Sequence, residues 1–173
     1  MKLKWVKYKY ILFVLVFSVC CVRCSGGYSF TGASIPPDAK TISIKTFPNY
    51  ASMVNPQLSQ KLSEDLRTMF ASQTSLIVVN SGGDLDISGE ITGYVTQASA
   101  LSSGDQVAMN RLSITIKVKF TNSKDPDSDF EQSFTRFRDY AATQDFSMVE
   151  NGLMTEIVAE LCEDVFNKSV VNW

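Results

Sequence analysis

The sequence predicts an α+β fold, a two-layer sandwich of two amphipathic helices on one face of a mixed, mostly antiparallel four- to five-stranded sheet. Three observations predict it. Apolar residues recur with helical spacing in two segments, several other segments alternate with a period of two, and the longest alternating pair is joined by a polar turn. Such helices and a one-sided sheet can bury their apolar faces only by stacking, so we expect the sheet's other face to be polar and free.

The first 23 residues differ from the rest and are predicted to be an export signal. They hold five of the 16 Lys and Arg residues and no acid, and they contain the apolar run 11–19. This run is shorter than the roughly 20 apolar residues of a transmembrane helix, which favours a signal peptide over an uncleaved anchor. Removing the signal leaves 11 positive and 18 negative charges, a balance that argues against general nucleic-acid binding.

Cysteines 20, 21 and 24 stand at the end of this signal. A thiol directly after a hydrophobic leader is the nucleophile that lipoprotein processing acylates, and Cys21 and Cys24 are the candidates. Cys24 follows Arg23, whereas processing usually requires a small residue there. A redox C-x-x-C belongs inside a folded domain, and a zinc site needs four ligands. The chain has no histidine and only Cys162 beyond residue 24, so we predict no metal, no cofactor and a core position for Cys162.

Residues 24–40 are rich in Gly, Ser and Pro and are predicted to be a tether that leads into a single domain over 41–173. The alternation in 41–47 predicts the first strand. Asn55 and Pro56 are typical of a helix start, because asparagine caps free amides and proline tolerates the first helical position.

Leucines at 58, 62 and 66 then recur on one face, which predicts an amphipathic helix over 56–72. The apolar run 76–79 follows this helix directly. A strand reached through a helix predicts a β-α-β crossover to a parallel neighbour.

The segment 85–97 is a predicted strand with two glycines. Its alternation puts Val95 on the apolar face and Tyr94 on the polar one. Gly89 and Gly93 fall on the apolar face, where a missing side chain favours a close backbone approach or a bulge.

The clearest alternation lies in 111–121, which is predicted to be the first arm of a hairpin. The polar turn 122–129 joins it to the second arm, 130–140. The second arm alternates less cleanly, since Phe134 shares a face with Arg136. We therefore expect a bulge or a twisted edge there.

The last helix is predicted to begin at a capping box formed by Ser147 and Glu150, and to run to about Asn167. Seven apolar residues recur on one of its faces. This helix and the one over 56–72 are the two that should cover the sheet.

Catalytic motifs are scarce. Without histidine, Ser-His-Asp and Cys-His catalysis are excluded. Asp84 and Asp86 remain as a carboxylate pair for a hydrolase, with a solvated strand face as the alternative. The aspartates of the turn 122–129 begin like a calcium loop, but Phe130 and Arg136 stand where an EF-hand needs glycine and an acid. The calcium interpretation therefore fails.

Positive charge is concentrated in the hairpin, which holds six of the eleven cations of the processed chain. Such a surface can meet the phosphates of a lipid head group or an acidic partner. The alternative is that these charges solubilise the sheet and protect its edge from pairing. The six candidate contacts are Arg111, Lys117, Lys119, Lys124, Arg136 and Arg138.

Five segments together resemble the LptE-like family of lipopolysaccharide-assembly lipoproteins of the Gram-negative outer membrane. They cover nearly all of the chain after the signal. They are YSFTGASIPPDAKTISI at 28–44, VNPQLSQKLSEDL at 54–66, DLDISGEITGYVTQ at 84–97, the hairpin at 109–140, and FNKSVVNW at the end.

The resemblance implies a protein that is not an enzyme, with two helices on a mostly four-stranded sheet. It implies that the chain partners and plugs an outer-membrane β-barrel, an LptD-like lipopolysaccharide translocon, and assists lipopolysaccharide assembly from the periplasmic side. The family places a lipidated cysteine shortly before the YSFTG segment, which favours Cys24 over Cys21. Ser25 after Cys24 indicates transfer to the outer membrane. The alternative functions are a lipid-anchored periplasmic binding module for another envelope glycolipid or glycan, and a periplasmic hydrolase.

Overall fold

The computed structural model describes residues 35–101 and 107–170, and the predicted signal and most of the predicted tether lie outside them. The described residues form five strands, two α-helices and one short 3-10 turn. In chain order these are β1 (Thr41–Ile44), α2 (Leu58–Gln73), β2 (Ile77–Val79), β3 (Leu85–Leu101), β4 (Val107–Asn122), η2 (Pro126–Ser128), β5 (Phe130–Ala141) and α3 (Phe146–Val170).

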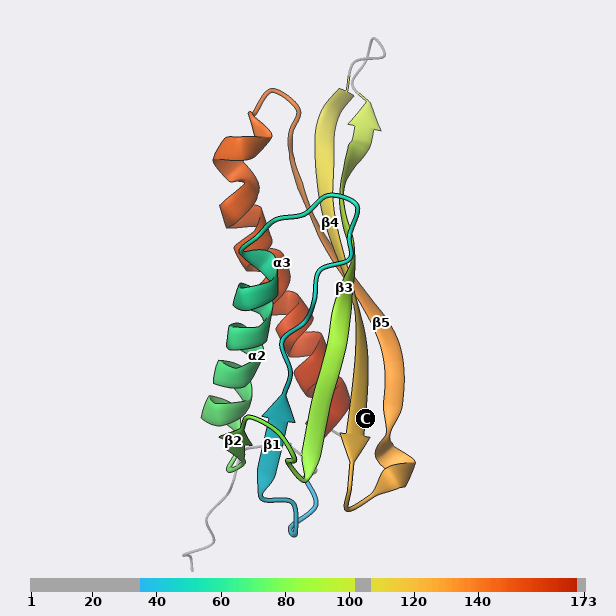
Figure 1. Cartoon of the computed structure of the whole chain (residues 1–173). Coiled ribbons are helices and arrows are strands. Elements are labelled where there is room, and N and C mark those ends of the chain that lie inside the picture. The colour runs from blue at the N-terminus through green and yellow to red at the C-terminus, as the bar shows by residue number, and fades with distance from the viewer. Residues whose placement is uncertain (1–34, 102–106, 171–173) are drawn as a thin grey trace, which may run out of the picture. The chain divides into compact units, whose positions relative to one another are not determined.

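All five strands belong to one mixed sheet in the order β2-β1-β3-β4-β5. β1 is parallel to both of its neighbours, whereas β3, β4 and β5 are antiparallel. Both helices lie on one side of the sheet (Figure 1). The predicted α+β sandwich and the crossover from β1 through α2 to β2 are confirmed. Neither helix of the described residues is long and apolar enough to cross a membrane.

The core lies between the helices and the sheet. Even-numbered residues of β4 from Leu112 to Phe120 face the helices and are buried, as the alternation predicts. From the helices, Phe70 and Phe166 meet with ring centroids 5.0 Å apart. Cys162 is buried, as predicted, and burial raises the pKa of its thiol to about 12. The thiol is therefore protonated at neutral pH and serves as a small apolar side chain.

Helix α2 begins two residues later than predicted. Asn55 Oδ1 does accept a 2.9 Å hydrogen bond from the Gln57 amide, but Pro56 and Gln57 form a turn and the helix starts at Leu58. The other end of the Asn55 side chain donates to Glu150 of α3 at 2.8 Å. Asn55 thus joins the loop before α2 to the second helix.

Strand β3 contains a bulge that reverses its alternation. The register with β4 shifts between Ile91 and Gly93, so Tyr94 turns to the helices and is 1% exposed, while Val95 turns away. The predicted faces of Tyr94 and Val95 were wrong, because the extra residue of a bulge moves every later side chain to the opposite face. The predicted close approach is confirmed at Gly89, where an added Cβ would lie 2.3 Å from the Lys117 carbonyl oxygen.

Strand β5 is an edge strand and has no bulge, so the bulge is excluded and a twisted edge remains of the two predicted alternatives. Its register with β4 is continuous from Phe130 to Ala141. Arg136 and Arg138 lie on the helix side with Phe134, as their spacing requires. They are accommodated there because they pair with acids on α3 rather than entering the core.

The capping box of α3 was also assigned to the wrong residues. The cap is Asp145, whose Oδ1 accepts hydrogen bonds from the Ser147 amide at 2.9 Å and the Ser147 hydroxyl at 2.8 Å. Glu150 does not reach back to the helix start, because its carboxylate binds Tyr94 and Asn55 instead. The helix runs to Val170, three residues beyond the predicted end.

Candidate functional site

The carboxylates of Asp84 and Asp86 hold the start of β3 to its neighbours. Asp84 Oδ2 accepts hydrogen bonds from the amides of Lys40 and Thr41 at 2.9 and 3.1 Å, and Lys124 Nζ lies 3.0 Å from Oδ1. These bonds hold the pKa of Asp84 well below its usual range. Asp86 accepts a 2.7 Å hydrogen bond from the Ser43 hydroxyl. Each carboxylate thus has its own structural partners, and an ionised Asp84 is a poor proton donor.

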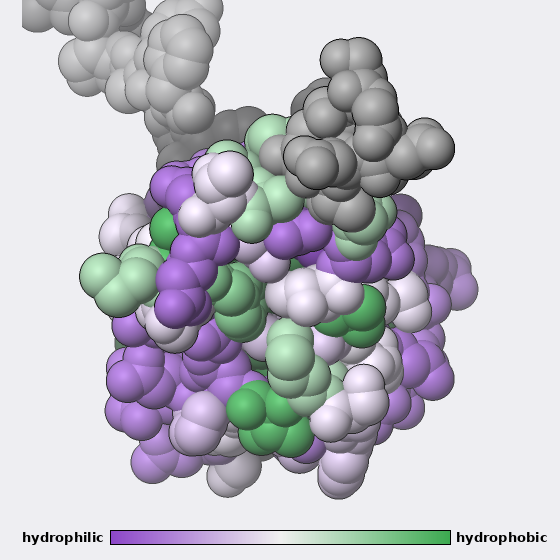
Figure 2. Space-filling view, turned by 90° about the horizontal axis from the view of Figure 1, so that it is seen from above, coloured by the Kyte–Doolittle hydropathy of each residue, from purple (hydrophilic) through white to green (hydrophobic). Residues whose placement is uncertain are grey.

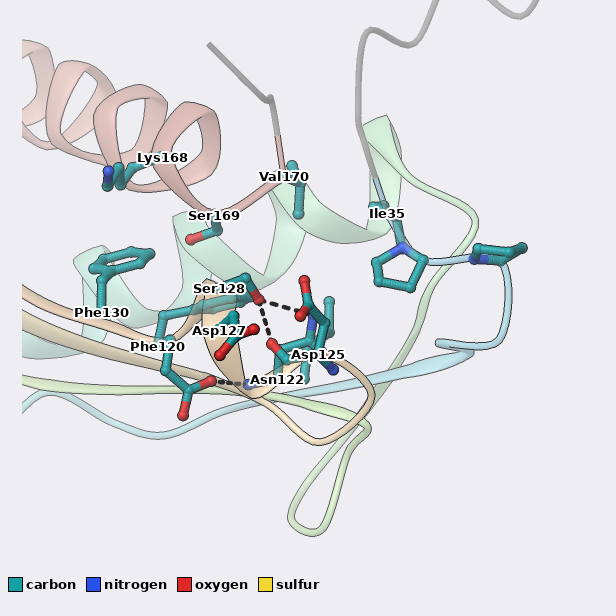
Figure 3. A pocket seen from close by; sticks show the side chains of 14 residues that line it. Ile35, Phe120, Asn122, Asp125, Asp127, Ser128, Phe130, Lys168, Ser169 and Val170 are labelled. Atoms are coloured by element: carbon teal, nitrogen blue, oxygen red, sulfur yellow. Dashed lines mark hydrogen bonds between the residues drawn. The ribbon is translucent and has the colours of Figure 1, made fainter.

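A cavity of about 430 Å³ lies between the end of α3, the turn around η2 and the chain segment that enters β1 (Figure 3). Its floor includes Phe120 and Phe130, and its rim carries Asp125, Asp127 and Lys168. The acids of this turn order the loop itself, since Asp129 Oδ1 accepts a 2.7 Å hydrogen bond from the Asn122 amide. Within the described residues no group of acids and cysteines could hold a metal ion. The acidic rim disfavours phosphate ligands.

The six cations of the hairpin do not form one surface, because the sheet divides them. Arg136 and Arg138 lie on the helix side, where Arg136 pairs with Asp164 at 2.6 Å. Arg138 bridges Glu156 and Glu160 at 2.8 and 2.5 Å. The hydrogen bonds that the two arginines donate to these acids raise the pKa of both arginines. These two arginines therefore fasten the edge strand to α3, and Lys124 is held by Asp84 at the end of the sheet.

The other three cations lie on the open face, which we define as the sheet face that the helices leave uncovered. They are Arg111, Lys117 and Lys119. Lys117 Nζ lies 2.5 Å from Glu131 Oε1, and this hydrogen bond raises the pKa of Lys117 and lowers that of Glu131. In the described part of the chain, no carboxylate lies within ion-pair distance of Lys119.

Lys117 and Lys119 line a groove of about 260 Å³ on this face, which we call the lysine groove. It is formed by Ser88, Gly89, Glu90, Lys117, Lys119 and Glu131. The two lysines are separated by two strand positions, about 7 Å. Because the Lys117–Glu131 pair is half-exposed, solvent screens it and it contributes little to stability, so an anionic ligand can displace Glu131. The groove can therefore bind a phosphate group beside hydroxyl groups.

Sequence reasoning identified the two lysines but missed Ser88, Glu90 and Glu131. Alternation alone assigns a residue to a face, whereas neighbours across strands depend on the register. The structure pairs Lys119 with both Ser88 and Glu131, and Lys117 with Glu90. The polar turn at 122–129 was the sequence feature from which these cross-strand neighbours could have been predicted, since the turn of a hairpin fixes the register of its strands.

Arg111 lies at the opposite end of the open face, away from the lysine groove. Its guanidinium lies 3.7 Å from the centroid of the Phe137 ring and donates two hydrogen bonds to Asp139, at 2.7 and 2.9 Å. The bond to Asp139 raises the pKa of Arg111. The guanidinium is thus held in place between an aromatic ring and a carboxylate.

Comparison with known proteins identifies one family. The sequence model of LptE, described as lipopolysaccharide-assembly, matches residues 39–169. No curated protein sequence matches the chain.

Solved structures share the fold at low sequence identity. A minor lipoprotein from Acinetobacter baumannii is 13% identical with a TM-score of 0.50, over 75% of this chain and 91% of its own. A hypothetical protein from Chlamydia trachomatis is 8% identical with a TM-score of 0.54, over 78% and 99%. An uncharacterized lipoprotein B from Nitrosomonas europaea is 15% identical with a TM-score of 0.50, over 81% and 88%.

Proposed function

Since the chain belongs to the LptE family of lipopolysaccharide-assembly proteins, we propose that it is an outer-membrane lipoprotein that partners and plugs the lipopolysaccharide-translocating β-barrel. The observation that carries this proposal is the family match over residues 39–169, which includes every strand and helix described above except the last residue of α3. In this role the protein assists lipopolysaccharide assembly from the periplasmic side of the outer membrane and is not an enzyme. The structural roles of Asp84 and Asp86 support the non-enzymatic assignment.

The proposed anchor is a lipid on Cys24, with Cys21 as the alternative. Two of the proteins with a similar fold are named lipoproteins, which supports this assignment. Ten residues separate Cys24 from Ile35, the first described residue. A chain of that length spans at most about 35 Å, so the tether would keep the domain close to the membrane surface.

The proposed contact with lipopolysaccharide is the lysine groove. Lys119 and Lys117 offer ammonium groups to a phosphate, and Ser88, Glu90 and Glu131 offer hydrogen bonds to sugar hydroxyls. The two helices carry seven acids and three bases, and Arg136 and Arg138 of β5 add two bases on the same side, so the helix side keeps a small acidic excess that disfavours an anionic lipid. These charges favour the open face for the ligand.

The experiment that tests the function is affinity purification of the full-length chain from its own envelope. We expect an outer-membrane β-barrel to co-purify, and depletion of the chain to reduce surface lipopolysaccharide. Mass spectrometry of the processed N-terminus should give an acylated Cys24. A monomer that binds glycolipid or glycan without any barrel would instead establish the alternative, a lipid-anchored binding module.

A further inference from the structure

The bulge in β3 places apolar side chains together on the open face. Val95 pairs with Ser113 of β4, and Ser113 pairs with Phe137 of β5, so the three residues form one rung across the sheet. Val95 and Phe137 are each 45% exposed. We call Val95, Ser113 and Phe137 the apolar rung. Without the bulge, Tyr94 would take the place of Val95 on this face.

Fixed polar groups flank the apolar rung on both sides. Arg111 covers the ring of Phe137 and is held by Asp139. On the other side, the hydroxyls of Thr115 and Thr135 hydrogen-bond at 2.9 Å. An aromatic residue and an arginine at the centre with polar groups around them are typical of the energetic centre of a protein–protein interface. Because these groups are already ordered, little side-chain entropy is lost on docking.

The open face is close to electrically neutral, unlike the helices. Along β3, β4 and β5 it carries four acids and three bases, and one of the acids, Asp86, also pairs with Lys45. The two helices carry seven acids and three bases, and Arg136 and Arg138 of β5 offset part of this excess by pairing with three of the acids. Docking buries charge, and a surface whose charges are balanced and mostly paired loses less hydration energy than one with an acidic excess.

The open face is large enough for a specific interface. Six rungs run from Asp86 to Gln97 between β3 and β4, and five of them continue to β5. With strands about 4.8 Å apart and residues spaced about 3.4 Å along each strand, this face covers about 500–600 Å². Burial of that area on each partner gives somewhat more than the roughly 1,000 Å² that a stable interface needs. Figure 2 shows one end of the molecule, where hydrophobic groups lie towards the middle of the view and hydrophilic residues lie mostly around them.

We infer that the open face, centred on the apolar rung, docks against the inner wall of the partner barrel. This inference rests on the proposed function and identifies the surface that performs it. A barrel interior is polar and alternates in side-chain direction, so a neutral face with paired charges and hydroxyls complements it, and two sheets can pack face to face about 10 Å apart. The lysine groove lies on the same face, so a ligand in it would be enclosed between the two proteins.

Site-specific photo-cross-linking of the full-length chain in the envelope tests this inference. The photoreactive residue benzoylphenylalanine would replace Phe137 or Thr135 on the open face, and Thr68 or Glu163 on the exposed sides of the helices. We expect the two open-face positions to cross-link the barrel at least fivefold more strongly. Cross-links from the helix positions alone would overturn the inference and leave the barrel partnership standing. Cross-links from no position, with no co-purifying barrel, would overturn both.

A matched pair of substitutions gives a second readout. Phe137→Ser removes the exposed aromatic of the apolar rung, and Met148→Ser removes an exposed apolar side chain from the first turn of α3. Both variants should keep their unfolding temperature. We expect Phe137→Ser to reduce the amount of co-purified barrel at least tenfold and Met148→Ser to leave it unchanged. Equal retention of the two variants would overturn the inference.

Discussion

The Tyr94 hydroxyl donates a 2.6 Å hydrogen bond to Glu150 Oε1, which joins the middle of β3 to the first turns of α3. Asn55 donates to the same oxygen from the loop before α2. One carboxylate therefore connects three segments that are far apart in the sequence. Desolvation and the bond to Glu150 raise the pKa of Tyr94, so the phenol stays protonated as the donor.

Tyr94→Phe should lower the free energy of unfolding by about 1–2 kcal/mol, because it leaves the Glu150 carboxylate with one partner fewer in a buried setting. Tyr140→Phe is the matched control, since it also removes the hydroxyl of a buried tyrosine but lies outside this network. Urea unfolding monitored by circular dichroism measures both. Equal losses for the two variants would show that the network contributes nothing.

Gly89→Ala should destabilise the fold by about 2–3 kcal/mol, because the added Cβ would meet the Lys117 carbonyl and the Phe47 ring, and the backbone of β4 cannot give way easily. Gly152→Ala in α3 is the opposite case. The added Cβ would meet nothing within 4 Å, and the substitution should stabilise the protein by about 0.5–1 kcal/mol, because alanine has a higher helix propensity than glycine. Thermal unfolding of both variants compares them directly, and a stable Gly89→Ala protein would contradict the close packing.

Neutralising the lysine groove with Lys117→Gln and Lys119→Gln should weaken binding of purified lipopolysaccharide at least tenfold, because two charge-assisted contacts are lost. The control is Arg136→Gln with Arg138→Gln, which removes two cations that already pair with α3 on the other face. This control should lower the unfolding temperature and leave binding unchanged. Loss of binding only in the control would place the ligand away from the open face.

Acid should weaken the fold through Asp84. Its pKa is lower in the folded protein than in the unfolded chain, so its contribution to stability is complete above about pH 4–5 and is lost as the pH falls through the folded value. Asp84→Asn should therefore have a lower unfolding temperature at pH 7 and a smaller decline between pH 5 and pH 3. Parallel declines for the variant and the natural chain would contradict this role.

The sequence alone was sufficient to predict which residues face the core wherever the local residue pattern agrees with the burial in the structure. The helix-facing residues of β4 could be predicted from alternation, since apolar and polar residues alternate strictly from Arg111 to Phe120. The faces of Tyr94 and Val95 could not be predicted, because the bulge becomes visible only in the pairing of β3 with β4. Either Ser147 or Asp145 satisfies the local rules for a helix cap.

The candidate site was predictable only in part. Lys117 and Lys119 were assigned correctly to one face, yet nothing local indicates that Glu131 neutralises the first and not the second. The role of Arg138 depended on two acids about 20 residues later in the chain. Ion pairs between elements follow from tertiary packing, which composition does not encode.

The position of β1 has a mechanical consequence. This strand comes first among the described elements, yet it lies inside the sheet, between β2 and β3 and parallel to both. A pulling force applied at Ala39 would therefore load two ladders of hydrogen bonds in shear, as well as the bonds from Lys40 and Thr41 to Asp84. Bonds loaded in shear share the force, whereas an edge strand can be peeled off one bond at a time. The domain is thus built to resist tension on its amino-terminal side.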